Sequence, residues 1–297
     1  MTLTILTPTY NRIRELGALY NSLKKQTCMT FEWVIVDDGS TDDTFSIINK
    51  WADEDIVNIK TLKKVNGGKH TALNYAIKKI TSELIFIVDS DDILTLDAVE
   101  IIYKYHSKYA DNESVCGYSF LRAFPNGEIN GKEFQSNELI ASYIETRLNS
   151  NDVMSDKAEV FKTKCLKEFP FPEFCNEKFL GEDIIWIQMA RKYKMVHINK
   201  AIYIGNYQED GLTKNRRIHN IKSPIGCMKR AEQFMKDDIN YKIRLKASLQ
   251  YIVYGKFAKR KISELYKCSN QKGLVIIAII PGYILYKVWK REYRVNF

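Results

Sequence analysis

Phe86-Ile87-Val88-Asp89-Ser90-Asp91-Asp92 is the stretch of this chain that decides its fold. The apolar residues from Leu84 to Val88 predict a buried strand, and three acids follow it within four positions. In an open α/β sheet, ligands bind just beyond the carboxyl ends of the strands. Carboxylates at that place can bind a hard divalent cation, which neutralises phosphate groups. Taken alone, the same acids also fit a solvated turn that caps a helix from Ile93 onward.

Two earlier strands end in polar clusters of the same kind. Residues 3–7 run into Thr7-Pro8-Thr9-Tyr10-Asn11-Arg12, and the strand at 31–36 runs into Asp37-Asp38-Gly39-Ser40-Thr41-Asp42. One helix is expected over residues 13–25, and a second one runs from the Asp37–Asp42 cluster to about Trp51. A further strand is expected over residues 57–62. This alternation predicts an α/β fold with a doubly wound, mainly parallel sheet and helices on both faces. The polar clusters should then meet at one edge as a nucleotide-binding crevice.

A fourth polar segment, Asn66-Gly67-Gly68-Lys69-His70, precedes a helix expected over 71–80. Its glycines permit close backbone approach, and the helix N-terminus after them can bind an anion. The spacing from glycine to lysine is not that of a P-loop. A plain turn with a helix cap is the alternative interpretation.

The composition is that of a globular protein of one large or two smaller domains. Its six cysteines and four histidines are scattered, without a C-x-x-C pair. We therefore expect neither a zinc site nor a disulfide framework. The first residues lack a basic region followed by an apolar one, so we expect no secretory signal.

The positive charge is concentrated in the C-terminal part of the chain. Residues 242–297 contain 13 Lys/Arg and 2 acids, whereas residues 1–241 carry a net charge of −2. This distribution argues against a nucleic-acid-binding face on the main domain and indicates a tail that meets an anionic partner. Within the tail, the 13 apolar residues 274–286 are interrupted by Pro281-Gly282 and fall short of the ~20 residues that span a bilayer. We expect an interfacial membrane anchor, or alternatively a helix docked on the main domain.

Four motifs, T-P-T-Y-N-R, V-D-D-G-S-T-D, N-G-G-K-H-x-A-L-N and V-D-S-D-D, occur here in an order that resembles family 2 glycosyltransferases with the GT-A fold. The resemblance covers about residues 1–215 and includes bacterial enzymes of surface-polysaccharide synthesis. It implies inverting transfer from a nucleotide-diphosphate sugar with a divalent cation, Mn²⁺ or Mg²⁺. The motif Gly181-Glu182-Asp183 followed by Trp186 resembles the family's E-D motif, although acids also favour a first helical turn through the macrodipole.

The resemblance implies a role for each matching residue. Asp91 would bind the metal with help from Asp89, Asp183 would be the catalytic base, and Glu182 would support it. Asp38 would read the base, which we expect to be uracil. The full set of expected donor-nucleotide residues is Thr7, Pro8, Thr9, Tyr10, Arg12, Asp37, Asp38, Lys69, Asp89 and Ser90. A basic segment would reach the diphosphate through Lys214, Arg216, Arg217 and His219. The alternative interpretation of this segment is a solvated basic loop.

These expectations define the organisation of the chain. Residues 1–220 would form the GT-A domain, with a donor half (1–110) and an acceptor half (111–220), and residues 221–297 a basic helical tail. The absence of Q-x-x-R-W argues against processive synthesis. The acceptor would be a lipid-linked oligosaccharide in capsule, exopolysaccharide or O-antigen synthesis. The enzyme would be cytoplasmic, peripheral on the inner face of the cell membrane at an anionic surface, and would not bind nucleic acid.

Two alternatives stand beside this interpretation. One is a non-catalytic, membrane-tethered subunit that binds sugar nucleotides, which the intact Asp91 and Asp183 argue against. The other is a sugar-phosphate nucleotidyltransferase, which usually carries a glycine-rich, basic N-terminal loop that is not found in this sequence.

Overall fold

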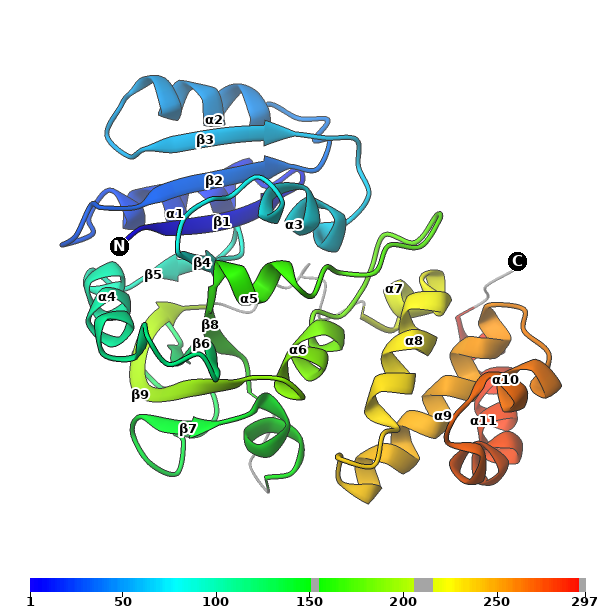
Figure 1. The fold of residues 1–297 in the computed structure, drawn as a ribbon. Coiled ribbons are helices and arrows are strands. Elements are labelled where there is room, and N and C mark those ends of the chain that lie inside the picture. Colours follow the sequence, from blue (N-terminus) through cyan, green and yellow to red (C-terminus); the bar gives the residue numbers. More distant parts are fainter. Residues whose placement is uncertain (151–154, 206–215, 294–297) are drawn as a thin grey trace. The chain divides into compact units, whose positions relative to one another are not determined.

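A computed structural model describes residues 1–150, 155–205 and 216–293 (Figure 1). The chain divides into two compact units. The first consists of Met1–Pro170 and Met189–Gln208, and the second of Phe171–Gln188 and Glu209–Phe297.

The first unit is built on one sheet, which contains nine strands within the described residues. Its order is β3-β2-β1-β4-β8-β6-β9-β5, and β7 also pairs with β9. The strands are β1 Leu3–Thr9, β2 Glu32–Asp37, β3 Ile59–Lys63, β4 Leu84–Ile87, β5 Ile93–Leu94, β6 Val115–Ala123, β7 Leu139–Ala141, β8 Lys157–Lys162 and β9 Lys194–Ile204. Strands β3, β2, β1 and β4 are parallel, as expected, whereas β8 runs antiparallel to both β4 and β6. The α/β sheet is therefore mixed beyond β4.

Helices cover both faces of the parallel part of the sheet. They are α1 Ile13–Leu23, α2 Thr44–Asp53, α3 Lys69–Ile77, α4 Ala98–Tyr109 and α5 Thr163–Lys167, and a π-helix spans Ile144–Leu148. One core joins buried residues of α1, α2 and α4 to Trp33 and Phe86 of the sheet. Helix α3 packs against β1, β2 and α5. Strand residues buried on both sides explain the nearly continuous apolar runs of β2 and β4.

The segment after the acid cluster differs from the helix that we considered there. Ile93 and Leu94 form the short strand β5, which pairs with Ile204 and Tyr203 of β9. Helix α4 begins only at Ala98. The pairing with β9 is a non-local contact that buries Leu94, and local helix propensity does not reveal it.

The second unit is helical within its described residues. Its helices are α6 Asp183–Ala190, α7 Arg216–Lys222, α8 Pro224–Phe234, α9 Tyr241–Phe257, α10 Ile262–Cys268 and α11 Lys272–Glu292. Helix α6 belongs to this unit up to Gln188. Helix α9 packs against both α8 and α11. Three helices of this unit therefore share one core.

The expected interruption of the tail helix at Pro281-Gly282 is wrong, because α11 continues through both residues for 21 residues. Proline removes one backbone hydrogen bond, which tertiary packing can offset. Gly282 supplies that packing, since a Cβ on it would lie 2.8 Å from Cβ of Ile252 on α9. The Trp289 ring also packs on Tyr254 of α9. Close contact with α9 therefore keeps the helix continuous where the sequence indicates a break.

Candidate active site

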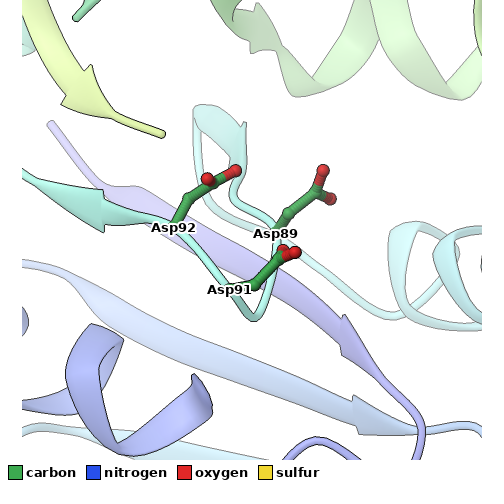
Figure 2. Close-up of side chains that lie close together, drawn as sticks. All are labelled: Asp89, Asp91 and Asp92. Atoms are coloured by element: carbon green, nitrogen blue, oxygen red, sulfur yellow. The ribbon is translucent and has the colours of Figure 1, made fainter. Parts of the chain in front are cut away.

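Three acids gather on the turn between β4 and β5, at the carboxyl end of the parallel strands. Figure 2 shows these acids, Asp89, Asp91 and Asp92. One carboxylate oxygen of each lies within 4.8 Å of one such oxygen of the other two. The backbone hydrogen bond from Val88 to the carbonyl of Leu6 (3.0 Å) continues the pairing of β4 with β1 up to the turn. The predicted strand therefore delivers its acids to one cluster.

The cluster has the charge distribution of a cation site. Burial and the charge of Asp89 raise the pKa of Asp91. Burial raises the pKa of Asp92 to about 6, although Arg122 opposes this effect. Burial also opposes ionisation of Asp89, but Lys69, with Nζ 2.5 Å from Oδ1, lowers its pKa below the ordinary value. Carboxylates that resist ionising together, and that offer only oxygen donors, fit a hard divalent ion such as Mn²⁺ or Mg²⁺.

Asp92 anchors the turn through side chains from β6 and β9. The hydroxyl group of Tyr203 donates to Oδ2 of Asp92 (2.6 Å) and accepts from the backbone N–H of Asp89 (3.0 Å). Nη2 of Arg122 donates to the same Oδ2 atom (2.9 Å), and its guanidinium lies 4.2 Å from the centre of the Tyr203 ring. The side chain of Asp92 is 5% exposed and that of Asp89 is 36% exposed. Asp89 and Asp91 are thus the more accessible acids of the cluster.

Asp38, the expected base reader, binds the loop before α3. Its carboxylate accepts hydrogen bonds from Nζ of Lys64 (2.8 Å), Nδ2 of Asn66 (3.2 Å) and the backbone N–H groups of Gly67 (3.0 Å) and Gly68 (2.7 Å). Loop amides that we expected to bind an anion therefore bind this carboxylate. To read a base, Asp38 has to exchange one of these donors, so that role stays a prediction.

Asp37 fixes the turn after β2. Its Oδ1 accepts from the backbone N–H of Ser40 (2.8 Å), and its Oδ2 lies 3.7 Å from Nζ of Lys63. Gly39 has a φ of 78°, and a Cβ on it would approach the backbone nitrogen of Asn66 to 2.8 Å. Only glycine permits both this conformation and this approach. The two loops are therefore held side by side.

The expected donor residues of β1 differ in accessibility. Thr7 is buried, and its hydroxyl accepts from Nε1 of Trp33 (3.0 Å). Thr9 and Pro8 are also buried within the strand. By contrast, Tyr10 is 44% exposed just beyond it. Of these residues, Tyr10 is the one free to contact a ligand ring.

Arg12 and Ser90 lie close to the acid cluster. Arg12 pairs with Glu15 (3.2 Å), and its positive charge partly offsets the effects that raise the pKa of Asp91. Ser90 is buried between two acids of the turn. The structure thus brings Arg12, Ser90, Lys69 and the acids together in the first unit.

The E-D motif opens helix α6 in the second unit. The backbone carbonyl of Glu182 accepts from Ile185 (3.0 Å), so Asp183 occupies the first helical position. Both oxygens of Asp183 pair with Arg230 of α8: Nε lies 2.5 Å from Oδ1, and Nη2 donates to Oδ2. Asp183 belongs to a different compact unit from the acid cluster, and its role as a base stays a prediction.

The basic residues expected at the diphosphate lie in or before α7. Lys214 lies outside the described residues. The guanidinium of Arg217 lies 4.4 Å from the centre of the Trp289 ring on α11, and the His219 ring stacks on Phe179 at 5.8 Å. Arg216 is exposed. Contact of these residues with a diphosphate stays a prediction.

Sequence reasoning missed the residues that hold the acids, namely Lys64, Arg122, Tyr203 and Arg230. One signal was present, because Arg122 is a charged residue within an otherwise apolar strand and such a residue needs a partner. For the other three no local signal exists, since their partners lie far away in the sequence.

Comparison with known proteins identifies the family. The profile described as Glycosyl transferase family 2 matches residues 4–153, which is half of the chain. A *Campylobacter jejuni* protein named GalNAc(5)-diNAcBac-PP-undecaprenol beta-1,3-glucosyltransferase is 25% identical over 97% of this chain and 96% of its own. The poly(ribitol-phosphate) beta-N-acetylglucosaminyltransferase TarS of *Staphylococcus aureus* is 37% identical over 36% of this chain, and the match spans a fifth of its length.

Solved structures agree on the fold. The crystal structure of *S. aureus* TarS 1–349 in complex with UDP-GlcNAc has a TM-score of 0.60 at 18% identity, covering 96% of this chain and 78% of that chain. A mannosyltransferase from *Pyrobaculum calidifontis*, in complex with GDP-Man and Mn²⁺, has a TM-score of 0.56 at 17% identity, covering 97% and 82%. The chain has the GT-A fold and belongs to glycosyl transferase family 2, which favours a glycosyltransferase over both alternatives considered above.

Proposed function

We propose that this family 2 glycosyltransferase transfers single sugars from a UDP-sugar to a hydroxyl group of a lipid-linked oligosaccharide. The reaction is inverting, metal-dependent and non-processive, and it serves capsule, exopolysaccharide or O-antigen assembly in a bacterium. The enzyme works in the cytoplasm, on the inner face of the cell membrane. The domains act as a donor half (1–110), an acceptor half (111–220) and a tail (221–297).

The observation that carries this proposal is the acid cluster of Asp89, Asp91 and Asp92 at the carboxyl end of β4. Asp91, assisted by Asp89, would hold Mn²⁺ or Mg²⁺. When bound, such an ion stabilises the charge that develops on a departing diphosphate. Asp92 already binds Tyr203 and Arg122, so its role is to stabilise the turn that carries the other two acids.

The remaining donor residues would bind the nucleotide. Tyr10, exposed beyond β1, offers a ring against which a base can stack. Lys69, now paired with Asp89, can turn to a phosphate once a divalent ion binds that acid, because the two cations compete for one carboxylate. The expectation that the donor nucleotide contains uridine is supported by the UDP-GlcNAc bound to TarS in a structure of similar fold.

Asp183 would act as the general base. It would take the proton of the acceptor hydroxyl group while that oxygen attacks the anomeric carbon and the nucleoside diphosphate leaves. A single displacement inverts the anomeric centre, so an α-linked donor gives a β-linked product. Both relatives named above have "beta" in the name of their reaction, which supports inversion.

A lipid-linked acceptor is supported by the relative of nearly equal length. The name of the *C. jejuni* protein specifies an acceptor carried on undecaprenol diphosphate. Such an acceptor is presented at a membrane surface, so an enzyme that acts on it gains from binding that surface.

Helix α11 has the features of an interfacial anchor. One face packs on α9, while Ile276, Ile277, Ile280, Ile284 and Val288 are between 51% and 73% exposed. Lys272, Lys287, Lys290 and Arg291 flank this apolar stripe. Within the described residues α11 is the one helix long and apolar enough to cross a membrane. Its packing on α9 and its basic flanks favour a position along an anionic leaflet.

The transfer itself is tested with defined substrates. The purified chain, UDP-glucose or UDP-N-acetylglucosamine, Mn²⁺ and an undecaprenyl-diphosphate-linked oligosaccharide ending in N-acetylgalactosamine should give a product one sugar longer. NMR of that product should show a β linkage. An α linkage would contradict inversion, and addition of many sugars to one acceptor would contradict non-processive transfer.

The anchor is tested with vesicles of phosphatidylglycerol and phosphatidylcholine. Ile280→Asn and Ile284→Asn should each weaken binding roughly tenfold, because each removes an apolar side chain from the bilayer. Ile56→Asn in the first unit is the matched control, since Ile56 is 51% exposed but lies far from the tail in the sequence. Equal binding by all variants would contradict the anchor.

A further inference from the structure

Arg230 of α8 holds the E-D motif in a two-point contact. Nε and Nη2 of its guanidinium meet the two oxygens of Asp183, which is the geometry of a bidentate arginine–carboxylate pair. The side chains of Asp183 and Arg230 are 13% and 17% exposed. Such a pair fixes the plane of the carboxylate as well as its position, because both oxygens are bound in parallel.

A second contact from the same helix holds the segment before the motif. Glu177 accepts hydrogen bonds from the backbone N–H groups of Ile225 and Gly226, both at 2.7 Å, in the first turn of α8. Oγ of Ser223 accepts from the backbone N–H of Phe179 (3.1 Å). Two backbone N–H groups of the first turn of α8 and the side chain of Ser223 just before it therefore fix the chain on the N-terminal side of Asp183.

The space around the pair is filled. A Cβ on Gly181 would lie 2.9 Å from Oδ1 of Asp183 and 3.2 Å from Nε of Arg230. The Arg230 guanidinium also lies 4.3 Å from the centre of the Phe234 ring, one turn further along α8. The carboxylate and the guanidinium thus have little room to change their orientation.

We propose that Arg230 is the positioning residue of the reaction, which aims the carboxylate of Asp183 at the acceptor hydroxyl group. This inference rests on the proposed role of Asp183 as base. A carboxylate has about four lone-pair sites, and a bidentate arginine uses one on each oxygen. One site on each oxygen remains for the acceptor proton, so the pair orients the base without blocking it.

The test compares kcat and KM for UDP release from UDP-glucose or UDP-N-acetylglucosamine, in the presence of Mn²⁺ and the undecaprenyl-diphosphate-linked oligosaccharide acceptor. Arg230→Met should lower kcat by about 10²-fold with the KM for the donor nearly unchanged, because misplacing a reacting group costs roughly that factor. The kcat of Arg230→Lys should lie between those of wild type and Arg230→Met. Lys229→Met, on the same helix and paired with Glu232 (3.0 Å), is the matched control and should behave as wild type.

Two further measurements separate positioning from folding. Millimolar guanidinium chloride should restore part of the activity of Arg230→Met, provided that this variant melts as wild type does, and should not restore Asp183→Asn. In the Asp183→Asn background, adding Arg230→Met should cause no further loss. If Arg230→Met misfolds, Arg230→Lys serves in the same comparison.

The outcomes distinguish this inference from the proposed function. Wild-type kcat in a folded Arg230→Met, beside an inactive Asp183→Asn, would overturn the positioning role alone. A further loss in the Asp183→Asn background would show that Arg230 acts on something other than Asp183, which also overturns it. Wild-type activity of Asp183→Asn would instead overturn the proposed base.

Discussion

Each compact unit pairs a half-buried arginine with an acid of a predicted motif, but the arginine holds a different kind of acid in each. In the first unit, Arg122 binds Asp92 and leaves Asp89 and Asp91 more accessible. In the second, Arg230 binds Asp183, the acid for which chemistry is proposed. The first pair fixes the loop that carries the functional acids, whereas the second fixes the functional acid itself. An ion pair beside a motif can therefore mean support for a backbone or orientation of a reacting group.

The largest effect should come from the accessible acids. Asp91→Asn removes a proposed metal ligand, and because a bound metal supplies several kcal/mol of charge stabilisation, nucleotide release should fall roughly 10³-fold or more. Calorimetric titration with Mn²⁺ should show weaker binding by the variant. Asp97→Asn, an exposed acid on the same unit that pairs with Lys200, is the control and should leave both properties intact. Unchanged Mn²⁺ binding by Asp91→Asn would contradict the metal assignment.

The ion pair between Arg122 and Asp92 should contribute to the stability of the first unit. Arg122→Met leaves Asp92 buried without its cation, and breaking a buried pair typically costs about 3 kcal/mol or more of unfolding free energy. Urea unfolding followed by circular dichroism measures this loss. Lys192→Met, which breaks the exposed pair with Glu168, should leave the unfolding midpoint near that of wild type. Equal midpoints for both variants would remove the distinction between the two pairs.

Acid should destabilise the first unit through a buried histidine. Burial lowers the pKa of His197 to about 4, while a hydrogen bond to the carbonyl of Ala141 and the charge of Glu145 oppose this shift and Arg147 and Lys157 add to it. The unfolded chain then binds the proton first, so stability is complete above about pH 6.5 and falls as the pH drops toward 4. Between pH 7 and pH 5 the loss should be about 2 kcal/mol. His197→Phe should flatten this dependence of urea unfolding on pH, and an unchanged slope would contradict it.

The smallest effect should come from the hydroxyl group that joins the two halves of the acid turn. Tyr203→Phe removes one donor to Asp92 and one acceptor for the N–H of Asp89. The free energy of unfolding should fall by about 1–2 kcal/mol, which is the usual cost of a buried hydrogen bond. The affinity for Mn²⁺ should fall less than in Asp91→Asn. A loss as large as that of Asp91→Asn would mean that Tyr203 does more than support the turn.

The sequence predicts the acids because they follow from local rules. An apolar run that ends in Asp89, Asp91 and Asp92 has to place them at the end of a strand, and β4 does end there. The expected parallel order also holds for β1 to β4, since each crossover helix follows its strand directly. These features depend on neighbours in the chain.

The partners of the acids depend on contacts between distant segments. Arg122 and Tyr203 reach Asp92 from β6 and β9. The position of those strands follows from the antiparallel pairing of β6 with β8 and the parallel pairing of β6 with β9, which periodicity does not reveal. The continuity of α11 is another case, because Gly282 fits against Ile252 only when α9 and α11 lie together. Local propensity correctly marks Pro281-Gly282 as unfavourable in a helix, and tertiary packing overrides it.

The most direct measurement is nucleotide release by the purified chain from a panel of UDP-, dTDP- and GDP-sugars, with and without Mn²⁺. We expect release of UDP from one donor, only when Mn²⁺ is present, and none from Asp91→Asn. Release at the same rate without the metal, or from Asp91→Asn, would contradict the metal site. If no donor is cleaved and calorimetry also shows that none binds, the proposal that the acid cluster serves a nucleotide sugar is wrong.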